Sequence, residues 1–84
     1  MEANVEQIRN DLMSLADAVS PKLMPTVVTH VRGCIEAGEL ALALEELCAY
    51  MGEANQRFDP VQLQTVEQLA RALGVESSWW SSTE

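Results

Sequence analysis

Apolar side chains recur three and four residues apart in four segments of this chain, which is the spacing of one face of an α-helix. No window alternates apolar and polar residues at the period of two that a half-buried strand requires. The pattern predicts helices over about residues 3–19, 25–37, 39–54 and 60–73. The predicted inward side chains are Val5, Ile8, Leu12, Leu15, Ala16 and Val19, then Met24, Val27, Val28, Val31, Cys34 and Ile35, then Leu40, Ala43, Leu44, Leu47, Cys48 and Met51, and finally Leu63, Val66, Leu69, Ala70 and Leu73.

Local signals mark the ends of these predicted helices. Gly38 and Gly74 stand where a helix commonly ends in a left-handed residue. The third helix follows Gly38 at once, so the second and third helices are expected to form a tight hairpin. Asp59, Pro60 and Gln62 form a start signal, with an acidic N-cap, a proline at the first helical position and the glutamine of a capping box.

Further signals near the ends of the predicted helices concern where the second helix starts and which apolar side chains pack at the ends of the fourth. The second helix can start at Pro21 or at Pro25, and Pro25 is favoured because a proline one turn inside a helix is costly. Phe58 precedes the N-cap of the fourth helix and is expected to pack as a hydrophobic staple. Val75, after the second glycine, is expected to supply the apolar contact that accompanies a glycine cap.

Four short amphipathic helices with short connections predict an all-α fold, a compact bundle with a tight central helical hairpin. The 84 residues allow one domain, expected over residues 1–80, with residues 81–84 as a frayed C-terminal tail. A chain of this size buries one thin core and leaves little material for a deep substrate cleft.

The charge balance is strongly acidic, because 13 aspartates and glutamates face 5 lysines and arginines and give a formal net charge of −8. Such a surface repels phosphate backbones and anionic membranes, so direct nucleic-acid binding and membrane association are not expected. The acidity serves either solubility alone or attraction to a strongly basic protein partner.

The start of the chain, residues 1–6, is acidic and lacks the basic and apolar regions of a secretory signal. No apolar stretch approaches the roughly 20 residues that span a bilayer. We therefore expect a cytoplasmic protein. Cys34 and Cys48 flank the hairpin joint closely enough to meet, but in a reducing compartment we expect two small core side chains rather than a disulfide.

Residues suited to catalysis or metal binding are sparse. His30 is the single histidine, and Cys34 lies one helical turn further on, but no third and fourth metal ligand follow at a recognisable spacing. The sequence contains no serine with a nearby base and no glycine-rich phosphate loop. We therefore expect a protein without enzymatic activity, metal or cofactor.

The predicted third helix carries a row of carboxylates. Glu39, Glu46 and Glu53 are seven residues apart, so two helical turns bring each nearly back to the same direction. Tyr50 lies between this row and the apolar side, and Leu42 lies on the other flank. The row is either a solvated face or an anionic docking strip with an aromatic and an aliphatic anchor.

Trp79 and Trp80 place two of the four aromatic residues side by side near the C-terminus. One is expected to fold back over the core, and its neighbour, which points elsewhere, is either partly exposed or an interface anchor. The predicted partner-binding residues are Glu39, Leu42, Glu46, Tyr50, Glu53 and Trp80.

The run VRGCIEAGELALALEELC, residues 31–48, resembles the central hairpin of small helical immunity proteins from polymorphic and contact-dependent growth inhibition toxin systems, including the MafI-type immunity family. Later parts of the chain are similar to the same family pattern, namely the run Phe58-Asp59-Pro60, residues 69–75 and the closing Ser78-Trp79-Trp80. The resemblance covers about residues 24–80. The Gly-Glu-x-x-x-Ala-Leu part of the hairpin is also similar to a tetratricopeptide hairpin.

The resemblance implies a bacterial antitoxin that binds the C-terminal toxin domain of a neighbouring cell's secreted effector and occludes its active site. The toxin of many such pairs is a basic RNase that attacks tRNA. The net charge of −8, which is an independent observation, agrees with a basic partner. The rival hypothesis is a helical adaptor or assembly module with a tetratricopeptide-like hairpin, which docks a peptide or self-associates.

Overall fold

The structure, a computed structural model, describes residues 4–75 and is helical through most of that range. Its elements are α1 (Val5–Val19), the short 3-10 helix η1 (Ser20–Lys22), α2 (Pro25–Glu36), α3 (Leu40–Glu53) and α4 (Pro60–Leu73). No strand occurs between residues 4 and 75. The predicted all-α bundle is therefore confirmed, together with its four helices and the start of the second helix at Pro25.

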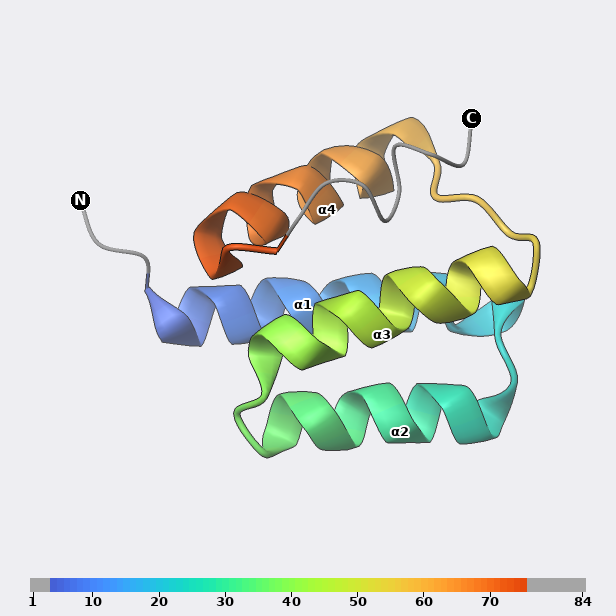
Figure 1. Cartoon of the computed structure of the whole chain (residues 1–84), viewed down its shortest axis with the longest axis horizontal. Helices are drawn as coiled ribbons and strands as arrows, with labels where there is room; N and C mark the ends of the chain where they lie inside the picture. Colours follow the sequence, from blue (N-terminus) through green and yellow to red (C-terminus); the bar gives the residue numbers. More distant parts are fainter. Residues whose placement is uncertain (1–3, 76–84) are drawn as a thin grey trace.

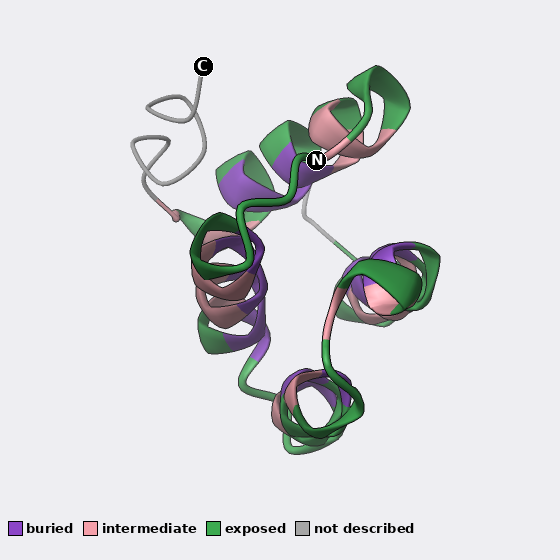
Figure 2. Ribbon diagram, turned by 90° about the vertical axis from the view of Figure 1, so that its right-hand side faces the viewer, coloured by how far each residue is buried: buried purple, intermediate pink, exposed green. Residues whose placement is uncertain are grey.

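The four helices alternate in direction along the chain, so that each helix is antiparallel to the next (Figure 1). α1 and α3 lie side by side, α2 packs against one side of this pair, and α4 packs against the other. Buried residues lie on the sides of the helices that face one another (Figure 2). They form one apolar cluster to which all four helices contribute.

Capping interactions explain where the helices begin and end, because the terminal turns would otherwise leave backbone groups unpaired. Asn4 caps α1, and its side chain accepts hydrogen bonds from the backbone amides of Glu6 and Gln7 in the first turn. Asp59 and Gln62 form the predicted capping box of α4. Gly74 ends that helix in the left-handed region, with φ 73°.

A left-handed asparagine stands at the start of the connection from α3 to α4. Asn55 adopts φ 59°, a conformation that asparagine tolerates better than most residues, and it follows Ala54, the C-cap of α3. Lys22 Nζ donates a hydrogen bond of 2.7 Å to the carbonyl oxygen of Arg57, which ties η1 to this connection. Phe58 is half-buried and packs against the core, as expected of a staple.

Helix α3 is the main contributor to the core, and its six predicted inward residues are all buried. Two predictions for other helices are wrong: Val5 is 61% exposed and Met24 is 68% exposed. Val5 starts α1 and Met24 is the N-cap of α2. Both residues therefore stand at a helix end. The apolar side of the helix continues to this end, but no other described part of the chain covers it there.

Within the described residues, no helix is both long and apolar enough to cross a membrane. The predictions for Trp79, for Trp80, for the tail over residues 81–84 and for a domain limit at residue 80 fall outside the part of the chain that the structure describes.

Candidate functional site

Among the described residues, no other element covers one side of helix α3, and this side is acidic. The sequence of α3 from Leu40 to Glu53 contains three glutamates and no lysine or arginine. Leu42, which is 42% exposed, adds an apolar side chain to this side near the N-terminal end of the helix. We define the acidic face as the five exposed or half-exposed residues on this side of α3, namely Leu42, Glu45, Glu46, Ala49 and Glu53.

The edge of the acidic face nearest α2 contains a cluster of polar side chains from both helices. His30 Nε2 lies 2.6 Å from Oε1 of Glu46, and the two side chains are 50% and 32% exposed. The Tyr50 ring meets the His30 ring edge to face, with 6.2 Å between ring centroids. Cys34 Sγ lies 4.0 Å from the same His30 nitrogen. The cluster links α2 to α3 at their shared surface.

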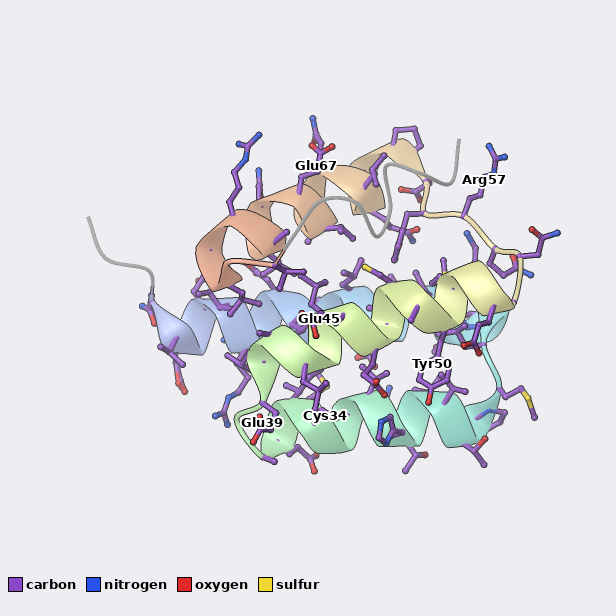
Figure 3. All side chains as sticks on the ribbon, in the orientation of Figure 1. Cys34, Glu39, Glu45, Tyr50, Arg57 and Glu67 are labelled. Carbon is purple, nitrogen blue, oxygen red and sulfur yellow. The ribbon has the colours of Figure 1, made fainter. Side chains whose placement is uncertain are left out.

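Tyr50, one of the predicted partner-binding residues, also takes part in packing within the bundle. Its side chain is half-buried and packs against the core cluster, and the label in Figure 3 places it between α2 and α3. Part of its area is therefore already used to hold the two helices together. A partner can reach only the remaining part.

The other predicted partner-binding residues are distributed over the same helix and its N-terminal end. Leu42 and Glu53 are exposed on the acidic face, and Glu46 is half-exposed there. Glu39 is the N-cap residue of α3 at the tip of the hairpin (Figure 3), where its backbone N–H donates to the Cys34 carbonyl. Trp80 lies outside the described residues.

Two residues of this region were not among the predicted binding residues. Glu45 lies on the flank of α3 toward α4 (Figure 3), and His30 reaches the acidic face from α2. The sequence contained a signal for the second. In an antiparallel hairpin, residues equally far from the joint lie opposite each other, and His30 and Glu46 are each eight residues from Gly38.

The basic residues of the described chain lie on other elements. Arg32 on α2 pairs with Asp17 on α1, and Lys22 of η1 bonds a backbone carbonyl. The remaining arginines belong to α1, α4 and the connection that precedes α4. The acidic face therefore keeps its negative charge, apart from the contact of Glu46 with the imidazole of His30.

The cluster does not have the geometry of a catalytic triad. In such a triad one ring nitrogen of histidine faces the nucleophile and the other faces the carboxylate. Here Glu46 and Cys34 both approach Nε2 of His30. Among the residues that the structure describes, no group of three or more His, Cys, Asp and Glu side chains is arranged to hold a metal ion.

The second thiol lies inside the bundle. Cys48 is 5% exposed, and burial raises the pKa of its thiol from 9.0 to about 12. At neutral pH this side chain is a protonated, apolar part of the core and not a nucleophile. Both cysteines are free thiols in the structure.

A shallow groove of about 330 Å³ lies between α1 and α4, on different helices from the acidic face. Its walls combine apolar and polar side chains, with one carboxylate and no histidine or cysteine, and they consist of Asp11, Ser14, Leu15, Ala18, Val61, Gln62, Thr65 and Gln68. Such a lining offers hydrogen bonds to a ligand but no nucleophile with a base.

Comparison with known proteins adds no relative: no protein family model, no curated protein sequence and no solved structure matches this chain.

Proposed function

We propose that this protein is an immunity protein, a non-enzymatic inhibitor that acts in the cytoplasm and binds a cognate toxin domain in a stoichiometric complex. The toxin would be a basic nuclease, such as an RNase that attacks tRNA, whose active site the inhibitor occludes. The observation that carries the proposal is the acidic face, where three carboxylates and exposed Leu42 share one side of a helix that has no basic residue.

The chemistry of nucleases makes them suitable partners for such a face. A nuclease binds the phosphates of its substrate with lysine and arginine side chains, and these same cations attract carboxylates. An inhibitor that presents glutamates on a rigid helix competes for the cations and keeps the nucleic acid out. The long-range attraction mainly accelerates encounter, while buried apolar contacts slow dissociation.

Leu42 and its surroundings supply the apolar part of this interface. Exposed Leu42 and half-exposed Ala49 give a small apolar area on the outward side of α3 with glutamates beside it, and interfaces commonly combine an apolar core with a polar rim. A face made by one helix is small, so the interface requires additional contacts from neighbouring elements to reach the area of a stable complex.

The decisive experiment is co-expression with the C-terminal domain encoded by the adjacent reading frame, with growth as the readout. Protection by the wild-type protein supports the proposal, and absence of protection contradicts it. The variant Leu42→Arg should lose protection, because it places a cation at the centre of the interface. Val61→Arg is the matched control, since Val61 is also exposed, at 72%, but lies on α4.

A second candidate function is a helical adaptor that docks a peptide. The observation in its favour is the groove between α1 and α4, lined by polar and apolar side chains, which is separate from the acidic face. The same pair of variants distinguishes the two functions, because Val61 lines the groove. An adaptor that uses the groove would be impaired by Val61→Arg and indifferent to Leu42→Arg.

A further inference from the structure

The contact between His30 and Glu46 has a defined direction. A carboxylate only accepts hydrogen bonds, so Nε2 of His30 carries the proton and donates it to Oε1 of Glu46 over 2.6 Å. The other groups that face His30 are Tyr50 from α3 and Cys34 from its own helix. The second oxygen of Glu46 has no hydrogen bond among the described residues.

We propose that His30 is a positioning residue of the acidic face: it holds the Glu46 carboxylate at the α2–α3 edge, ready for a guanidinium group of the cationic partner. The inference rests on the proposed function, because it concerns how the same face binds its partner. It adds a residue on α2, outside the acidic face itself, to the determinants of affinity.

The physical argument is pre-organisation. A half-exposed glutamate without a partner samples several rotamers, and binding must then immobilise it. The hydrogen bond to His30 selects one arrangement before the partner arrives, and the packing of the His30 ring against Tyr50 selects the orientation of the donor. Loss of this restraint should weaken binding about three- to tenfold, the effect of freeing one such side chain.

The test uses the full-length protein and a hexa-arginine peptide as the probe, with affinities from NMR titration of the α3 amides at pH 7.5 and low salt. His30→Phe keeps an aromatic ring against Tyr50 but removes the donor, and should weaken binding three- to tenfold. His30→Gln restores a donor and should bind within twofold of wild type. Thr29→Ala, an exposed neighbour on α2, is the control and should change nothing.

One further measurement separates positioning from general damage. In a Glu46→Gln background, His30→Phe should have no additional effect, because the carboxylate that His30 holds is absent.

Equal affinity of wild type and His30→Phe, or an undiminished effect of His30→Phe in the Glu46→Gln background, would overturn the inference. So would a failure of the peptide to shift the α3 amides of wild type. None of these results affects the growth experiment, which decides the proposed function separately.

Discussion

Removing the charge of the acidic face while keeping the size of its side chains isolates its electrostatic contribution. The triple variant Glu45→Gln, Glu46→Gln and Glu53→Gln changes the net charge from −8 to −5, because three negative charges are lost. A second triple variant, with Glu6→Gln, Asp11→Asn and Glu67→Gln, has the same net charge but alters α1 and α4. We expect only the first to slow association with the toxin domain strongly.

The expected magnitude follows from the spacing of the charges. Two helical turns separate Glu46 from Glu53 by about 10 Å, so each carboxylate can face its own cation. At an encounter distance of about 8 Å, one pair of unit charges gains about 0.5 kcal/mol in water. Screening reduces this to about 0.4 kcal/mol in 10 mM salt and about 0.2 kcal/mol in 100 mM salt.

Three such pairs contribute about 1.2 kcal/mol at the lower salt concentration and about 0.6 kcal/mol at the higher one. Converted to rates, the first triple variant should associate about eightfold more slowly than wild type in 10 mM salt and about threefold more slowly in 100 mM salt. The control variant should stay within about twofold at both concentrations, because its charges lie further from the interface.

The assay is stopped-flow measurement of the association rate at the two salt concentrations, after circular dichroism has shown that both variants are folded. Equal slowing by the two triple variants would show that net charge matters and that the acidic face has no special role. An unchanged rate in the first variant would refute electrostatic steering by α3.

Three further predictions concern stability. Leu44→Ala, at a fully buried site, should lower the free energy of unfolding by about 3–5 kcal/mol in urea denaturation. Leu42→Ala, on the exposed side, should lower it by less than about 1 kcal/mol. Similar losses of unfolding free energy in the two variants would contradict the assigned core. Gly33→Ala, inside α2 with open space around it, should raise the free energy of unfolding by about 1 kcal/mol. Gly38→Ala, at φ 83°, should lower the free energy of unfolding by about as much. Thermal unfolding that shows both changes with the same sign would be inconsistent with this backbone. Burial raises the pKa of Cys48 from 9.0 to about 12, so the folded state binds the thiol proton more tightly than the unfolded chain does. The protonated thiol therefore contributes its full stabilisation of the folded state below pH 9, and this contribution disappears as the pH approaches 12. Over that window wild type should lose up to about 4 kcal/mol more than Cys48→Ala, and parallel pH profiles of the two proteins would argue against a buried thiol.

Part of the candidate site follows from helical geometry alone. A rotation of about 100° per residue places Leu42, Glu46 and Glu53 on the side of α3 opposite its apolar positions, and within residues 4–75 that side is exposed or half-exposed. Helical geometry does not reveal that His30 reaches Glu46, because that contact joins residues 16 positions apart on two helices. It depends on the register of the hairpin, which the turn at Gly38 sets.

The sequence by itself determined the local structure: where the helices begin and end, and which side of each is apolar. The reason is that caps such as Asp59 with Gln62, and left-handed glycines such as Gly74, act within a few residues of themselves. Only the tertiary structure decided which apolar positions are covered, leaving Met24 exposed and Tyr50 half-buried between α2 and α3. Burial depends on the ends and register of neighbouring helices, and a periodic pattern within one helix contains no information about its neighbours.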